Sequence, residues 1–535
     1  MLALLPSWLA SPRAGIPILG RMSLPAPQAP TLRWINAWLT ALPVAYILSP
    51  AAVIGLPFLR TLPSAARALL LLFVVSQLLP AVFAPAPLLA LLLAALRILL
   101  MFGLIGIGHA LQESGRLRLA LPGLGLVYLT ALVYSQWQGV DWLSGRLIHP
   151  YLTTTSLALT AAYGLWLCLF LPGRWAWRAP GALLALGALF ASGSRGPLIA
   201  AVIGVLAGLM MGRQRRLWTG VTALAAGAVL VGVLVIGEKG QIATLERFRQ
   251  LDLAGRQVIW HNTLDLIHDL PVGGVGAYRV GTALAPTSEC YLFAALSDEA
   301  GCPTWVRLSG QPWLIAHNGV LHQWAETGPL GTLGLLSLLG ASMFVAARRR
   351  DPLGFAVLSG VVVTNIIDNT WLVPGAVSGE LFWIMVGTQL RHFNRTDLPG
   401  ASLTGTGVLA IVGLPLLGIA SSTPAPAPLR MALFSAAPTI TAGTPYRLLA
   451  QFQGQPGTYM VSLASCSLGC RSVRTAGVKV TEEGGTLVIP DLRLGTEAQQ
   501  RMELRLYADQ PLALRPLAVY RWKVNVTAPA STAAP

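Results

Sequence analysis

Three short polar segments interrupt an otherwise apolar chain, and their residue types suit phosphate binding and proton transfer. Arg195, in the sequence Ser-Gly-Ser-Arg-Gly-Pro, offers a permanent charge and a planar set of donors that match phosphate oxygens. Arg256 stands four residues before Trp260, so the two residues share one face if this segment is helical. His317, followed by Asn318, carries an imidazole, which can accept a proton near neutral pH as a general base must.

Each of these segments also fits a purely structural role. Arg195 could mark the end of a membrane span and extend its charge to the surface. A lone histidine such as His317 often serves as a hydrogen-bonding residue at an interface. His261, Asp265 and His268 have a helical spacing that metal ligands use, but the polar outward face of an amphipathic helix has the same spacing. The residue types alone leave these alternatives open.

The composition indicates an integral membrane protein. Of the 535 residues, 54% are hydrophobic and only 11% are charged, whereas a soluble protein has roughly 25% charged residues. Several apolar runs approach the roughly 20 residues that span a bilayer as a helix, and the pattern predicts about twelve spans. No segment alternates strictly between polar and apolar residues, so the spans are expected to be helical rather than strands of a barrel.

The net charge of +16 comes mainly from arginines clustered between apolar runs, a distribution that predicts cytoplasmic loops rather than nucleic-acid binding. The three polar segments then fall on the opposite side, which we expect to be the periplasmic side of a bacterial inner membrane. The arginine pattern does not fix the side of the N-terminus. An even number of spans places both chain ends on the same side of the membrane, which does not agree with the charges near the two ends. The clusters are Arg174 with Arg178, Arg213 to Arg216, Arg348 to Arg350, and Arg391 with Arg395.

The chain divides into a long membrane region and a C-terminal soluble domain. A Pro/Ala-rich linker separates them, and the short runs after it, punctuated by Gly and Pro, predict a β-sandwich. One helix is expected in the external loop, from about 255 to 270. The predicted parts are an N-terminal segment (1–33), a transmembrane domain (34–421) with a large periplasmic loop (238–316), the linker (422–428), the β-sandwich (429–527) and a disordered tail (528–535).

Four cysteines lie in segments that the arginine pattern places outside the cytoplasm, where disulfides form. Cys290 could pair with Cys302, and Cys466 with Cys470; the alternative is four unpaired thiols. Cys168 stands alone in a predicted span and is expected to be a small core residue.

Taken together, the polar segments resemble the O-antigen ligase family, which includes O-antigen polymerases and periplasmic O-linked oligosaccharyltransferases. The resemblance covers roughly Gly145 to Arg395. It rests on Ser194-Arg195-Gly196, on Gly255-Arg256 with Trp260 ahead of Pro271 to Gly276, and on His317-Asn318 followed after nine residues by Gly328-Pro-Leu-Gly331.

The resemblance implies a polytopic, GT-C-like glycosyltransferase that takes part in lipopolysaccharide biosynthesis. Such an enzyme moves a glycan from an undecaprenyl pyrophosphate carrier to an acceptor hydroxyl, with inversion at the anomeric carbon and without a metal or other cofactor. It implies His317 as the catalytic base. The other roles carried over are donor pyrophosphate binding for Arg195, Arg256 and Arg279, and support of the base for Asn318, His322, Glu326 and Trp260.

The acceptor is left open between lipid A-core, a growing polymer and a protein. The C-terminal domain departs from the compact ligase pattern and could recruit an acceptor or a partner. A function of another class, a transporter or flippase for lipid-linked glycans, would have to use Arg97, His109 and Asp368, the other ionisable residues within apolar segments.

Overall fold

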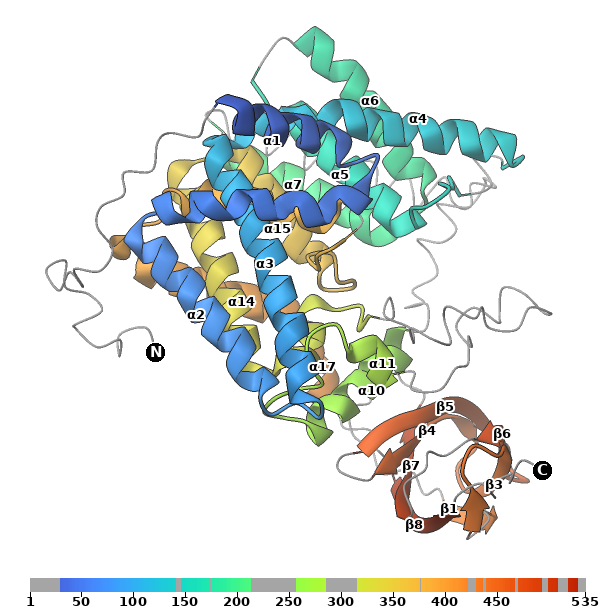
Figure 1. Cartoon of the computed structure of the whole chain (residues 1–535). Helices are drawn as coiled ribbons and strands as arrows, with labels where there is room; N and C mark the ends of the chain where they lie inside the picture. The colour runs from blue at the N-terminus through green and yellow to red at the C-terminus, as the bar shows by residue number, and fades with distance from the viewer. Residues whose placement is uncertain are drawn as a thin grey trace, which may run out of the picture.

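The protein has a helical region and a C-terminal β-domain, which lies at one end of the helical region beside α10 and α11 (Figure 1). The predicted linker and tail fall outside the residues that the structure describes. The computed structural model describes residues 29–140, 146–172, 175–212, 256–284, 315–375, 377–421, 430–435, 439–466, 470–492, 499–508 and 518–527.

Apolar helices of very different length make up the helical region. In chain order they are α1 (Ala29–Ala41), η3 (Tyr46–Thr61), α2 (Ser64–Ala81), α3 (Pro87–Leu111), η4 (Ser114–Ala120), α4 (Leu121–Trp137), α5 (Thr154–Phe170), α6 (Trp175–Ala191), α7 (Arg195–Met211), α10 (Arg256–Asp269), α11 (Val280–Leu284), α14 (Gly319–Arg349), α15 (Pro352–Thr364), α16 (Ser378–Leu390), η5 (Arg395–Asp397) and α17 (Leu398–Ser421).

The predicted membrane region is confirmed, but the count of about twelve spans is not. Within the described residues, 4 helical segments are long and apolar enough to cross a membrane: Ser64–Ala81, Pro87–Leu111, Ser114–Trp137 and Gly319–Arg349. Other apolar helices, such as Pro352–Thr364, are shorter than the roughly 20 residues that a perpendicular span requires. The apolar run at residues 221–236, which is long enough to count among the expected spans, lies outside the described residues.

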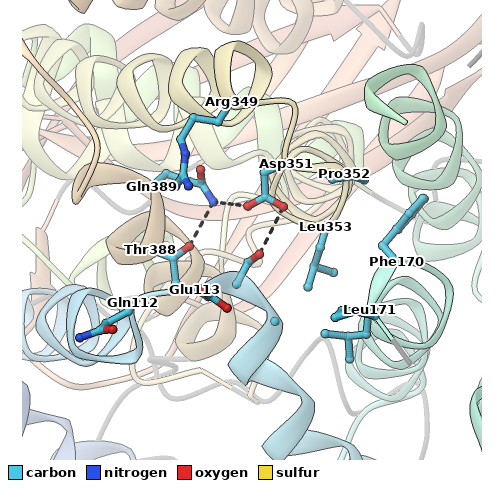
Figure 2. Close-up of a pocket in the computed structure, with 13 residues that line it drawn as sticks. Gln112, Glu113, Phe170, Leu171, Arg349, Asp351, Pro352, Leu353, Thr388 and Gln389 are labelled. Atoms are coloured by element: carbon cyan, nitrogen blue, oxygen red, sulfur yellow. Dashed lines mark hydrogen bonds between the residues drawn. The ribbon is translucent and has the colours of Figure 1, made fainter. Parts of the chain in front are cut away.

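A cavity of about 340 Å³, lined by Arg349 and Asp351 among other residues, lies at the end of the helices where α14 finishes with Arg348 and Arg349 (Figure 2). We call this the arginine-rich end. Asp351 organises this end: its Oδ1 accepts from Gly354 N at 3.0 Å, which caps α15, and from Ser114 Oγ at 3.2 Å. Its Oδ2 accepts from Gln389 Nε2 at 2.8 Å, so one carboxylate joins α15, α16 and the segment after α3. The arginine pattern predicts that this end of the helices faces the cytoplasm.

The long helix α14 is broken near its start. Gly328 has φ 63° and ψ −169°, a conformation that is essentially restricted to glycine, and Pro329 follows it. A Cβ on Gly328 would lie 2.1 Å from Val272 O, so the glycine also lets the segment after α10 approach the helix. Gly331, the other glycine of this motif, lies against α2, where Gln77 Nε2 donates to Gly331 O at 3.0 Å.

The predicted C-terminal β-domain is confirmed. Its 3-stranded sheet has the order β1-β3-β6 and its 5-stranded sheet the order β2-β8-β7-β4-β5. Apolar residues of both sheets, including Phe452, Leu463 and Leu504, form one core. The strands are β1 (Arg430–Ser435), β2 (Thr439–Thr441), β3 (Tyr446–Gln453), β4 (Gly457–Cys466), β5 (Cys470–Val480), β6 (Gly485–Leu492), β7 (Gln499–Ala508) and β8 (Ala518–Thr527).

The cysteine predictions meet the structure only in part. Cys466 and Cys470 are register partners across β4 and β5, although their side chains are outside the described set. Cys290 and Cys302 lie outside the described residues, so both disulfides remain predictions. Cys168 is a free, buried cysteine in α5, as expected of a small core residue.

Replacing Gly328 by alanine should destabilise the helical region. The new side chain would force a glycine-only backbone conformation, at roughly 3 kcal/mol, and would also collide with Val272 O. The measurement is the apparent melting temperature in detergent, with Gly407→Ala as the control, because a Cβ at Gly407 in α17 meets nothing within 4 Å. Equal melting temperatures for the two variants would contradict the assignment of strain to this break.

Candidate functional site

His317 lies immediately before α14, in a backbone conformation that its neighbours hold in place. Its φ is 49°, in the left-handed region that few residues other than glycine adopt. The next residue, Asn318, is buried and caps α14, because its Oδ1 accepts from Leu321 N at 2.9 Å. Asn318 Nδ2 also donates to Ile366 O at 2.9 Å, so the cap is bonded to the segment that follows α15.

That segment places Asp368 against His317. The Nδ1 atom of His317 lies 3.3 Å from Asp368 Oδ1, and the two side chains are 30% and 12% exposed. The segment is fixed to the start of α14 by a further hydrogen bond, in which Gly319 N donates to Asn365 O at 2.8 Å. The site therefore holds an imidazole that is accessible from outside and has a carboxylate on one ring nitrogen.

Helix α10 contributes a third contact to the same point. Trp260 Nε1 donates to His317 O at 3.3 Å, and the Trp260 ring packs with Ala316 and Leu321 in a small apolar cluster. The helix spans Arg256–Asp269, close to the expected bounds, and Thr263 lies buried on it, as Trp260 does. The opposite face carries the exposed His268.

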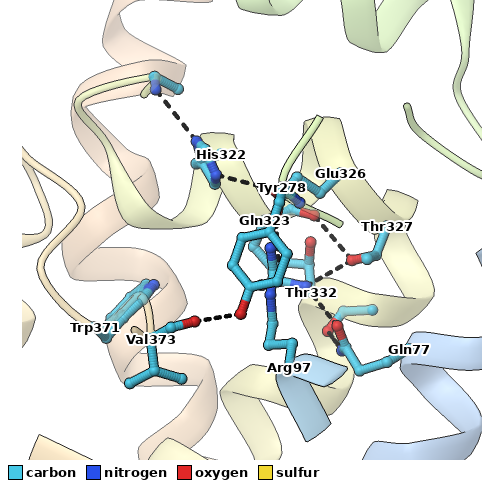
Figure 3. Close-up of polar contacts among 12 residues, drawn as sticks. Gln77, Arg97, Tyr278, His322, Gln323, Glu326, Thr327, Thr332, Trp371 and Val373 are labelled. Carbon is cyan, nitrogen blue, oxygen red and sulfur yellow. Dashed lines mark hydrogen bonds and ion pairs between the residues drawn. The ribbon is translucent and has the colours of Figure 1, made fainter. Parts of the chain in front are cut away.

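His322 and Glu326 do not touch His317 directly; they belong to a buried polar cluster one to two helical turns further along α14 (Figure 3). His322 Nδ1 accepts from Ala316 N at 3.2 Å, and His322 Nε2 lies 3.2 Å from Glu326 Oε1. Because Nδ1 is the acceptor, Nε2 carries the proton that faces the carboxylate. The hydrogen bond from Ala316 N to His322 connects this cluster to the site, because Ala316 is the residue before His317.

Arg97 of α3 compensates the buried charge of Glu326. Its Nη1 lies 2.5 Å from Glu326 Oε2, and its guanidinium group stacks 4.2 Å from the centre of the Tyr278 ring. Tyr278 N donates to Glu326 Oε1 at 2.6 Å, and Tyr278 Oη donates to Val373 O. Burial raises the pKa of the Tyr278 phenol, so the hydroxyl stays protonated as a donor.

Asp368 and Arg97 are functional residues that the sequence motifs miss. No short motif contains them, so the sequence alone connects them only with the alternative of a transporter. The signal that could have found them is an ionisable side chain in an apolar segment, which persists there only with a partner or beside water. His317 and Glu326 are those partners.

The structure describes the side chains of two of the three predicted phosphate-binding arginines, Arg195 and Arg279. Arg195 is the first residue of α7 and is half-buried, in a turn that Arg146 stabilises by donating from Nε to Ser192 O at 3.1 Å. Arg279, just before α11, has a buried Nη1 without a hydrogen-bond partner among the described residues. Arg256 begins α10, but its side chain is outside the described set. Their convergence on His317 remains a prediction.

No metal centre is found among the described side chains: no group of three or more His, Cys, Asp or Glu is arranged to hold an ion there. The possible metal spacing on α10 is not tested, since the side chains of His261 and Asp265 fall outside that set.

Comparison with known proteins adds one finding. Residues 180–336 match the family model described as O-antigen ligase, a stretch that runs from α6 into α14 and includes Arg195, Arg256 and His317. Asp368 and the β-domain lie beyond the match. A search of curated proteins finds no match to the chain. The chain therefore carries an O-antigen ligase domain in residues 180–336.

Proposed function

We propose that this protein transfers a glycan from a polyprenyl pyrophosphate carrier, such as undecaprenyl pyrophosphate, to an acceptor hydroxyl at the periplasmic face of a bacterial inner membrane. The O-antigen ligase domain supports a glycan transferase of this type. The observation that carries the proposal is the contact between His317 and Asp368 at the start of α14. Apolar helices around this point suit a donor whose lipid tail stays in the bilayer.

In the proposed reaction His317 removes the proton from the acceptor hydroxyl. The acceptor oxygen bonds to the anomeric carbon from the side opposite the carrier, and the bond between that carbon and the pyrophosphate oxygen breaks. The electron pair leaves on the pyrophosphate, so the products are the glycosylated acceptor with inverted configuration, polyprenyl pyrophosphate and a protonated His317. Pyrophosphate is already a good leaving group, so the protein must mainly remove one proton and stabilise growing negative charge.

Asp368 suits His317 to this task. An ionised carboxylate can only accept hydrogen bonds, so the ring nitrogen facing Asp368 must carry a proton. The Nε2 atom is then the unprotonated nitrogen that can accept the acceptor's proton. The nearby carboxylate also stabilises the imidazolium that forms, as in other histidine bases that are oriented by an acidic residue.

The arginines are proposed to bind the pyrophosphate. Arg195 and Arg256 begin helices α7 and α10, where the helix N-termini add favourable electrostatics for an anion. Arg279 has an unpaired buried Nη1 among the described residues, so it has a donor to offer. The inference for Arg256 rests on its sequence motif.

We do not favour a transporter, because the residues it would use contact fixed neighbours. Arg97 pairs with Glu326, and His109 Nε2 lies 2.7 Å from Thr61 Oγ1 between α3 and η3. Asp368 contacts His317 at the edge of the helical region. The acceptor stays open between lipid A-core, a growing polymer and a protein, and parallel assays with each acceptor class decide among them.

Substituting His317 by alanine should lower kcat by roughly 100-fold to 10,000-fold, the usual contribution of a general base. Asp368→Asn should lower kcat less, because the base is retained but is no longer oriented by a charge. The assay is transfer from a polyprenyl-pyrophosphate oligosaccharide by the purified protein, with EDTA present. His268→Ala removes an exposed histidine of α10 and is the matched control. A His317→Ala variant that folds and keeps the wild-type rate would exclude this base.

Substituting Arg195 or Arg279 by alanine should weaken donor binding, since each would remove a charge-assisted contact to pyrophosphate. We expect a higher KM for the donor and weaker competition by free polyprenyl pyrophosphate. Arg116→Ala is the control, because Arg116 is an exposed arginine near the arginine-rich end. If Arg195→Ala and Arg279→Ala bind the donor as well as the control and the wild type do, these two arginines do not hold the pyrophosphate.

The two amide substitutions of His322 should separate its two contacts. Asparagine can place an acceptor near the Nδ1 position for Ala316 N, whereas glutamine can place a donor near the Nε2 position for Glu326. If His322 acts by holding the backbone before His317, His322→Asn should retain more of the wild-type kcat than His322→Gln, at similar donor KM. The reverse order would mean that the contact with Glu326 matters more.

A further inference from the structure

The outer face of the five-stranded sheet is buried over β4 and β7, although the core of the β-domain lies on the other face. The outer face of β8 stays exposed. Along β4 and β7 the core-facing residues, such as Val461 and Leu504, alternate with residues of the outer face. A free outer face would be exposed to water, but these residues are only 1% to 6% exposed. They are Ser462, Ala464, Glu503, Arg505 and Tyr507.

Helices α10 and α11 lie on this side of the β-domain and contact β5, as Figure 1 shows. Across the junction, Arg505 Nη2 lies 3.5 Å from Asp269 Oδ1, with side chains 7% and 9% exposed. Asp269 is the last residue of α10, where the helix dipole disfavours a carboxylate. Arg505 of the β-domain therefore compensates the negative charge of Asp269, which is unfavourable at the C-terminal end of α10.

Arg505 is itself held within the β-domain. Its Nε and Nη2 donate to Glu503 Oε2 at 3.2 Å and 3.1 Å, and Arg521 Nε donates to Glu503 Oε1 at 2.8 Å. Burial opposes the ionised form of Glu503, but these hydrogen bonds lower the pKa of its carboxyl. The guanidinium group thus lies between two carboxylates, one on β7 and one on α10.

The other end of α10 acts at the site. Trp260 precedes Asp269 by nine residues, about 14 Å along a helix axis, and donates to His317 O. Since an α-helix transmits a displacement of one end to the other, the position of Asp269 affects that of Trp260.

We propose that β5 and the buried outer face of β7 beside it form a docking surface for α10 and α11, and that the ion pair between Arg505 and Asp269 holds α10 so that Trp260 stays against His317. The effect on catalysis rests on the proposed function, but the docking does not. The C-terminal β-domain is then a positioning element for the membrane site.

The test is a double-mutant cycle in the full chain with Asp269→Asn, Arg505→Gln and both together. Hydrogen exchange of residues 256–284 reports docking, and transfer kinetics report positioning. We expect faster exchange in all three variants, a kcat that is roughly tenfold to a hundredfold lower, and a double variant no worse than the more impaired single one. Arg521→Gln is the control, because it removes a charge beside Glu503 but leaves the pair across the junction.

Unchanged exchange of residues 256–284 in the three variants would overturn the docking. Single effects that multiply in the double variant would show that the two residues act separately, which also overturns it. Faster exchange with wild-type kcat would overturn the positioning role. Faster exchange in a protein whose wild type transfers no glycan to any acceptor would instead leave the docking intact and refute the proposed function. Exchange within α14 serves as the check that the variants fold.

Discussion

The site depends on holding one histidine in a left-handed backbone conformation at the start of a buried helix. Such a conformation costs roughly 1–3 kcal/mol and persists only where neighbours fix it. Asn318 caps the helix after His317, Trp260 donates to its carbonyl, and Asp368 contacts its ring. These contacts come from α14, α10 and the segment after α15, so the orientation of the imidazole reflects how three separate parts of the chain pack.

Beneath this point a buried ion pair supports the same backbone. Bringing Arg97 and Glu326 out of water costs several kcal/mol per charge, which their attraction offsets only when geometry and further hydrogen bonds are good. Tyr278 supplies both a backbone donor and an aromatic face, and His322 supplies a second contact to the carboxylate. The result is a rigid connection between α3, the α10–α11 segment and α14. Such rigidity suits a base that must remain aligned while a long lipid-linked donor enters and leaves.

Local patterns predicted much of this protein, whereas long-range pairing was beyond them. The apolar helices and the β-strands bounded by Gly and Pro could be predicted from local sequence patterns. Helix α10 begins and ends within one residue of its expected bounds. Asp368 lies 51 residues from His317, and their contact depends on how the segment after α15 folds back on α14. The burial of Glu503 and Arg505 could not be predicted either, since both look like ordinary solvent-facing strand residues, and the pairing of Arg505 with Asp269 of α10 is a long-range contact.

The stoichiometry of the reaction catalysed by the purified wild-type chain in EDTA tests glycan transfer most directly. The quantities to compare are the polyprenyl pyrophosphate released from a labelled lipid-linked glycan and the glycan joined to acceptor. The proposed reaction should release one carrier for each glycosylated acceptor, with an inverted anomeric linkage. A donor that binds the protein, or moves across a vesicle membrane with it, but stays intact with every acceptor class would contradict glycan transfer at His317.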